Sequence, residues 1–129
     1  MRREVGLLSL FTLLGCASPV APDASGAWGS AQASLMMSRA GGALELQCGS
    51  GAIDGTWTLT VDGVFTATGV TFGGGGPQPI EGRPPRPSRF TGLISGNTFI
   101  LSATVIASNT TLGPFRMIRG GPGVSMLCL

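Results

Sequence analysis

The sequence predicts an all-β protein that folds as a single small eight-stranded antiparallel up-and-down barrel. Glycine supplies 22 of the 129 residues. This share is well above the usual value of about 7%, and it lacks the every-third-residue period of collagen. After residue 27, apolar residues recur at every second position in short runs, and glycine-containing turns separate the runs. A chain of this length forms one domain, so we expect the runs to share one sheet.

Residues 1–15 have the features of a signal peptide. Arg2 and Arg3 precede an uncharged apolar run, 5–14, and the motif Leu13-Leu14-Gly15-Cys16 ends it. Such a run in a helix spans about 15 Å, half of the roughly 30 Å hydrocarbon core, so it is too short to cross a membrane. We therefore expect these residues to direct export and to be removed.

The motif at residues 13–16 resembles the lipobox of bacterial lipoproteins: a leucine, an aliphatic residue, a small residue and a cysteine. The resemblance implies diacylglycerol transfer to the Cys16 thiol, cleavage after Gly15, and acylation of the new amino terminus by a fatty acid such as palmitate. Two or more acyl chains would anchor the protein stably in a membrane of the cell envelope. Ala17, in place of an aspartate, implies the outer membrane in a cell that has two. The alternative is a plain secretory signal cleaved near Ala17 or Ala21.

Residues 16–26 are expected to form the lipidated cysteine and a short extended tether, because they are rich in proline, alanine and serine and show no periodicity. The barrel domain then covers residues 27–129. In chain order, the predicted strands are 28–38, 43–48, 53–60, 64–72, 89–95, 98–107, 111–119 and 123–128.

Two turns are specified in detail by their residues. Asp62-Gly63 suits a three-residue hairpin with Gly63 in the left-handed conformation, which places Leu59 opposite Phe65. Gly49-Ser50 suits a two-residue turn.

That second turn would place Glu45 directly opposite Asp54, a like-charge pair of the kind that glycosidases use. The alternation of Leu44 and Leu46 puts this face outward, so we expect a solvated barrel exterior and not a catalytic pair.

Alternation also assigns the interior of the barrel. One apolar face per strand suits a closed sheet, and eight strands leave an interior that side chains fill or that holds one small ligand. The predicted interior residues are Leu44, Leu46, Ile53, Trp57, Leu59, Phe99, Leu101, Ala103, Val105, Phe115 and Met117.

Cys48 and Cys128 are the two thiols that remain after cleavage. An even pair in an exported domain predicts one disulfide. Both cysteines end predicted strands, 43–48 and 123–128, at the same rim of the barrel and on either side of strand 28–38. They would lie about 9.5 Å apart if all three strands continued there, so the bridge requires the first strand to begin late or to bend away.

Gly26-Ala27-Trp28 at the start of the first strand, together with Arg119 near the end of the chain, resembles the calycin barrels, the lipocalin and avidin group. In that group a Gly-x-Trp tryptophan packs beside an arginine of a C-terminal strand at the closed end of the barrel. The resemblance implies that Trp28 and Arg119 form such a packing pair.

The composition argues against catalysis. The chain has no histidine and no tyrosine, and all 8 basic side chains are arginines. It therefore lacks the usual proton-transfer residue, the commonest metal ligand and any Schiff-base lysine. We expect no enzyme activity, no metal and no cofactor. A net charge of +2 is too small for a nucleic-acid-binding surface.

The connection 73–88 is the one long loop of the predicted barrel. It contains five prolines and carries Arg83 and Arg86, and Arg89 follows directly. The sequence favours either a stiff polyproline II segment that presents guanidinium groups to phosphate or carboxylate, or a plain disordered loop. If the protein binds a partner through its surface, we expect this loop to contact an anionic envelope polymer, a lipid or a protein.

Together these patterns predict a lipid-anchored, non-enzymatic protein of the bacterial envelope, acting as a binding or structural module. Two alternatives stay open. One is a periplasmic protease inhibitor of the β-barrel type, whose N-terminal segment enters the protease. The other is a carrier of a small apolar ligand inside the barrel.

Overall fold

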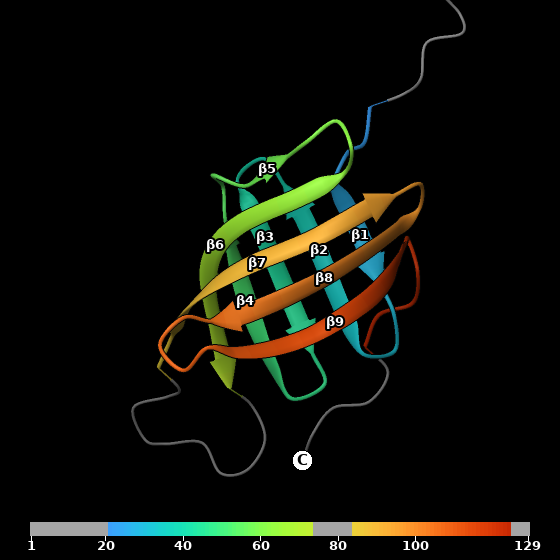
Figure 1. The fold of residues 1–129 in the computed structure, drawn as a ribbon. Helices are drawn as coiled ribbons and strands as arrows, with labels where there is room; N and C mark the ends of the chain where they lie inside the picture. Colours follow the sequence, from blue (N-terminus) through green and yellow to red (C-terminus); the bar gives the residue numbers. More distant parts are fainter. Residues whose placement is uncertain (1–20, 74–83, 125–129) are drawn as a thin grey trace, which may run out of the picture.

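The computed structural model describes residues 21–73 and 84–124 (Figure 1). Within these ranges the chain forms nine strands and no helix, so none of the described residues belongs to a helix able to cross a membrane. The strands are β1 (Gly26–Gly29), β2 (Ala33–Ser38), β3 (Gly41–Leu46), β4 (Gly49–Asp54), β5 (Thr58–Leu59), β6 (Val64–Gly73), β7 (Arg86–Ser95), β8 (Thr98–Val105) and β9 (Thr110–Arg119).

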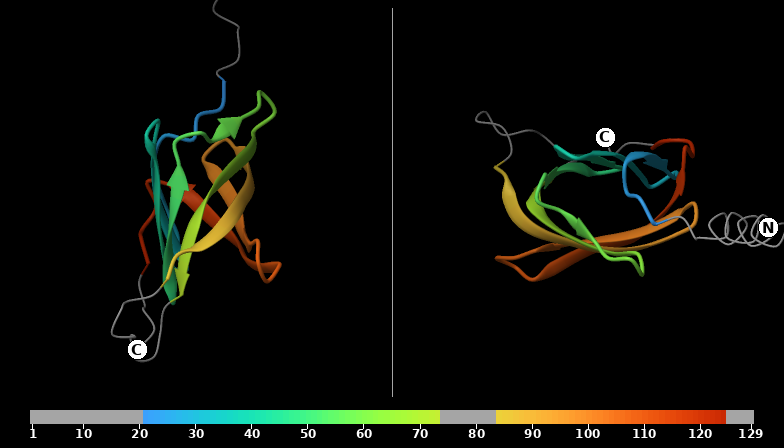
Figure 2. Two further views of the ribbon diagram at one scale, coloured as in Figure 1. Left: turned by 90° about the vertical axis from the view of Figure 1, so that its left-hand side faces the viewer. Right: turned by 90° about the horizontal axis from the view of Figure 1, so that it is seen from above.

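The strands form a closed antiparallel barrel. Consecutive strands pair from β1 to β4 and from β6 to β9, β4 pairs with β6, and β9 returns to pair with β1. Eight strands therefore complete the ring, as the view from above shows (Figure 2), and the short β5 adds to β6. The predicted all-β fold and its up-and-down barrel are confirmed.

The first predicted strand, 28–38, is wrong, because it is two strands joined by a turn at residues 30–32. The Ser30 hydroxyl accepts the backbone N–H groups of Gln32 and Ala33, each at 3.2 Å, and this local capping reverses the chain. Because the chain has this extra strand near its start, β9 is the strand that pairs with β1 and closes the barrel. The sequence prediction gave that role to residues 123–128. Residues 125–129 lie outside the described part of the chain.

The predicted turn at Gly49-Ser50 is also wrong, because residues 47–48 make the turn between β3 and β4. Glu45 consequently pairs with Ser50, and Asp54 pairs with Gly41. The physical reason lies inside the barrel. In the observed register Leu46 lies opposite Gly49 and Ile53 lies opposite Gly42, so each large inward side chain faces a glycine, whereas the predicted register would place Leu46 opposite Ile53. The register differs by an even number of residues, so the predicted inward and outward faces are unchanged.

The other predicted hairpin is confirmed. Leu59 pairs with Phe65, and Gly63 has a φ of +91°. A side chain at Gly63 would collide with the carbonyl oxygen of Ile94, and the Gly63 oxygen accepts the Ile94 N–H at 2.8 Å. Glycine is therefore required here both for its conformation and for the close approach of β7.

Large side chains fill the interior of the barrel around Phe99. Phe99 lies between two aromatic rings, with its centroid 5.2 Å from Trp28 and 5.2 Å from Phe65, both in edge-to-face geometry. The largest fully buried apolar side chains are Trp28, Phe65, Phe90, Phe99, Leu101 and Met117.

The barrel has two distinct ends. We call the upper end the one where residues 21–25, the 55–63 connection and the β7–β8 turn meet (Figure 1). The lower end carries the β1–β2, β3–β4 and β8–β9 turns, the end of β6 and the start of β7. The tether thus joins the barrel at the end opposite to the β6–β7 connection.

Candidate functional site

Arg119 and Trp28 lie in contact at the upper end, as the calycin resemblance implies. They are register partners of β9 and β1, and the Arg119 guanidinium carbon lies 4.1 Å from the centre of the Trp28 ring. This distance is typical of a cation–π interaction. The indole Nε1 of Trp28 donates to the carbonyl oxygen of Ala24 at 2.9 Å.

The same arginine binds the segment that leads from the tether into the barrel. Arg119 donates one hydrogen bond to the carbonyl oxygen of Ser25 at 2.8 Å and another to that of Asp23 at 2.7 Å. Ala24 between them is fully buried. Arg119 and Trp28 therefore fix residues 23–25 across the upper end and close it.

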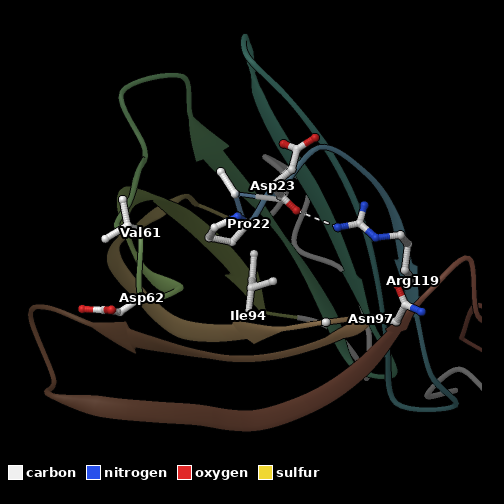
Figure 3. Close-up of a pocket in the computed structure, with 9 residues that line it drawn as sticks. Pro22, Asp23, Val61, Asp62, Ile94, Asn97 and Arg119 are labelled. Carbon is white, nitrogen blue, oxygen red and sulfur yellow. Dashed lines mark hydrogen bonds between the residues drawn. The ribbon is translucent and has the colours of Figure 1, made fainter. Parts of the chain in front are cut away.

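A pocket of about 560 Å³ lies beside this closure (Figure 3). The carboxylates of Asp23 and Asp62 point in different directions from its rim, so they do not form a catalytic pair. The pocket is lined by Ala21, Pro22, Asp23, Val61, Asp62, Ile94, Gly96, Asn97 and Arg119.

Asp23 stays ionised at neutral pH. The backbone N–H of Ser25 donates to its Oδ1 at 3.0 Å and holds the pKa of Asp23 below its usual value, and the charges of Arg119 and Arg39 act in the same direction. A carboxyl with a lowered pKa cannot serve as a general acid near neutral pH.

The lower end has a smaller, mainly apolar pocket of about 210 Å³. Typical small-molecule sites span roughly 300–1,000 Å³, so this pocket is too small for an ordinary ligand. Its lining residues are Gln32, Leu46, Gln47, Cys48, Phe72, Leu112 and Phe115. Cys48 thus lies in the β3–β4 turn at this end, whereas Cys128, its predicted partner, lies outside the described residues.

The prediction that Arg83, Arg86 and Arg89 lie together on one loop is wrong for two of them. Arg86 and Arg89 both belong to β7, which begins at Arg86. Arg89 is three positions after Arg86, so the two side chains lie on opposite faces of the strand. Arg86 lies on the inner face beside Thr71 and Gly73, and its buried Nε has no hydrogen-bond partner among residues 21–73 and 84–124. Arg89 is exposed on the outer face, and Arg83 lies outside the described residues. The described arginines therefore do not form one multidentate group.

Arg89 lies instead within a surface of threonines, which we call the Arg89 face. Thr68 on β6 and Thr104 on β8 are its register partners. The Thr104 and Thr111 hydroxyls are hydrogen-bonded at 3.1 Å, and the Thr68 hydroxyl donates to the Asp54 carboxylate at 3.2 Å. A shallow pocket of about 230 Å³ beside Arg89 is lined by Thr56, Thr58, Thr66, Ala67, Thr68 and Arg89.

Sequence reasoning missed the Arg89 face. Alternation with the predicted interior residues Trp57, Ala103 and Val105 leaves Thr58 and Thr104 on outward positions. Only the pairing of β6, β7 and β8 shows that Thr68 and Thr104 flank Arg89. The alternate spacing of threonine in the sequence predicts that one face of a strand is polar. It does not predict which side chains of neighbouring strands lie beside that face.

Within residues 21–73 and 84–124, no three histidine, cysteine or carboxylate side chains come together as a metal site would require. Glu45 and Asp54 are both exposed and are not register partners. The chain matches no protein-family model, and neither the curated proteins nor the solved structures include a significant match to it.

Proposed function

We propose that this protein is a lipid-anchored binding module of the bacterial cell envelope, without enzymatic activity, which binds a carboxylate-bearing envelope glycan through the Arg89 face. The observation that carries this proposal is an exposed Arg89 among threonine hydroxyls on the outer wall of the barrel. Because large side chains occupy most of the interior, the outer wall offers more room for a partner.

The chemistry of the Arg89 face suits such a glycan. A guanidinium group can donate two parallel hydrogen bonds to one carboxylate, and it is less strongly hydrated than an ammonium group. Threonine hydroxyls both donate and accept hydrogen bonds, as sugar hydroxyls do. Thr68 and Thr104 flank Arg89 on the two neighbouring strands, so one sugar unit could contact all three.

The lipobox-like motif at residues 13–16 supports the membrane anchor. Ala21 is five positions after Cys16, and a chain of that length reaches at most about 18 Å. The anchor would therefore hold the upper end of the barrel near the bilayer, because Ala21 lines the pocket at that end.

Two structural observations disfavour the alternatives. In protease inhibition by an inserted N-terminal segment, that segment must be free, but Arg119 binds residues 23–25 to the barrel and Ala24 is buried. In apolar ligand transport, the barrel must hold a cavity, but the apolar pocket at the lower end measures only about 210 Å³.

Co-sedimentation with isolated cell-wall sacculi tests the glycan-binding proposal. We expect Arg89→Gln, in the mature chain with Cys16→Ser, to weaken binding about tenfold, because a charge-assisted hydrogen bond contributes about 1.5 kcal/mol or more. Arg39→Gln is the matched control, since Arg39 is also exposed but lies in the β2–β3 turn at the upper end. Equal binding by the Arg89 and Arg39 variants would overturn the proposed role of the Arg89 face.

A further inference from the structure

Apolar side chains form a row across the outer wall of the barrel, near its upper end; three of them are exposed and one, Ile100, is partly buried. Val64 on β6 pairs with Leu93 on β7, and Leu93 pairs with Ile100 on β8. Val64 and Leu93 are each 46% exposed. Ile118 on β9 is the diagonal neighbour of Ile100 and is 44% exposed. We call these four residues the Val64 row.

Val61 extends the apolar surface to the upper rim of the barrel. It is 85% exposed and lines the upper pocket together with Ala21, the first described residue (Figure 3). At this exposure almost the whole Val61 side chain is open to contact with an external apolar phase.

The Val64 row lies at the end where the tether enters the barrel (Figure 1). Because Cys16 precedes Ala21 by five residues, an acylated Cys16 would keep the upper end within about 18 Å of the bilayer. Among possible partners, the bilayer is therefore the apolar phase that the row would meet most often.

Charge at the edge of the row also suits a bilayer surface. Arg116 is exposed on β9 and is the register partner of Ile100. An arginine beside an apolar surface can bury its methylene groups and extend its guanidinium group to lipid phosphate. Asp62 follows Val61 and lies at the rim, where it can stay in water.

We propose that the Val64 row and Val61 dock the barrel on the bilayer that holds its own lipid anchor, with Arg116 at the level of the headgroups. The proposal rests on the proposed lipid anchor. It also sets the orientation of the protein. Leu93 is four positions after Arg89, about 13 Å along β7, so the Arg89 face would stand clear of the membrane.

Two fluorescent labels on the lipidated protein test this docking. The protein is reconstituted in vesicles of phosphatidylethanolamine and phosphatidylglycerol, and an environment-sensitive dye is attached at Val61→Cys or, as matched control, at Ile106→Cys. Ile106 is 51% exposed but lies in the β8–β9 turn at the lower end. We expect blue-shifted emission and quenching by brominated lipid at position 61, and neither at position 106.

A variant with Val64→Thr, Leu93→Thr and Ile100→Thr then replaces three of the four side chains of the Val64 row with threonine, which is polar and β-branched. We expect it to remain attached to the vesicles and to lose most of the quenching at position 61. Circular dichroism checks that this variant is folded. The comparison of labels at positions 61 and 106 does not depend on this variant, because neither label changes a residue of a strand.

Each adverse result has a distinct meaning. Similar emission at positions 61 and 106 in attached protein would overturn the docking proposal and leave the anchor intact. A blue shift at position 61 that depends on protein concentration and not on vesicles would identify a second copy as the partner, and would also overturn it. Failure of the protein to float with vesicles at all would overturn the lipid anchor, and the docking proposal with it.

Discussion

Arg119 is the residue that connects most features of the upper end. Its guanidinium group lies over the Trp28 ring and donates to the carbonyl oxygens of Asp23 and Ser25. Lysine has the charge but not the planar group that can stack on an indole while it donates in two directions. The closure of the upper end therefore depends on the shape of the side chain as well as on its charge.

We expect Arg119→Lys to lower the free energy of unfolding by about 1–3 kcal/mol, because it removes a cation–π contact and at least one hydrogen bond. Urea denaturation followed by Trp28 and Trp57 fluorescence measures this change. Arg116→Lys, on the exposed face of the same strand, serves as control and should change stability by less than about 0.5 kcal/mol. Equal effects of the two variants would contradict the role of Arg119.

At the scale of elements, the path after β9 bears on the predicted disulfide. The Val124 N–H donates to the Ser34 hydroxyl at 2.7 Å, and Ser34 pairs with Glu45 on β3. The chain at residue 124 thus lies one strand away from β3, which ends at the turn that contains Cys48. Four further residues reach at most about 14 Å. This path supports a bridge to Cys128, and the bridge stays a prediction.

We expect mass spectrometry of the unreduced mature protein to show a mass lower by two hydrogens than that of the dithiol, with neither Cys48 nor Cys128 open to alkylation. Cys128→Ser should then lower the free energy of unfolding by about 2–4 kcal/mol, because a disulfide restricts the unfolded chain. Cys16→Ser in the unlipidated mature chain is the control and should leave stability unchanged. Two alkylated thiols in protein taken from the envelope would contradict the bridge.

At the scale of the whole molecule, the proposed binding surfaces lie at different distances from the upper end of the barrel. The upper end carries the tether entry, the Val64 row and the Trp28–Arg119 contact, and the Arg89 face lies lower on the same outer wall. An anchor at residue 16 would therefore hold one part of the wall near lipid and the other part away from it. This arrangement requires that Cys16 is lipidated.

We expect Cys16→Ser to move the protein from the membrane fraction to the soluble fraction and to abolish the incorporation of radioactive fatty acid, because a single apolar signal segment that is removed cannot hold the protein in the bilayer. Ser18→Ala, two residues later, is the control and should label normally. Undiminished label in the Cys16 variant would exclude lipidation at this thiol.

Local patterns in the sequence were sufficient to predict the fold class, the barrel and part of its interior, because side chains alternate between the two faces of a strand whatever its partner. For the same reason Gly63, Leu59 and Phe65 could be placed correctly from one turn. The buried Phe90 and Ile94 on β7 were not among the predicted interior residues. The β3–β4 register, the strand that closes the barrel and the neighbours of Arg89 could not be predicted. They depend on pairing between distant segments, where alternation allows every register that differs by an even number of residues. Packing inside the closed barrel, such as Leu46 and Ile53 each lying opposite a glycine, selects among those registers, and it exists only in the folded molecule.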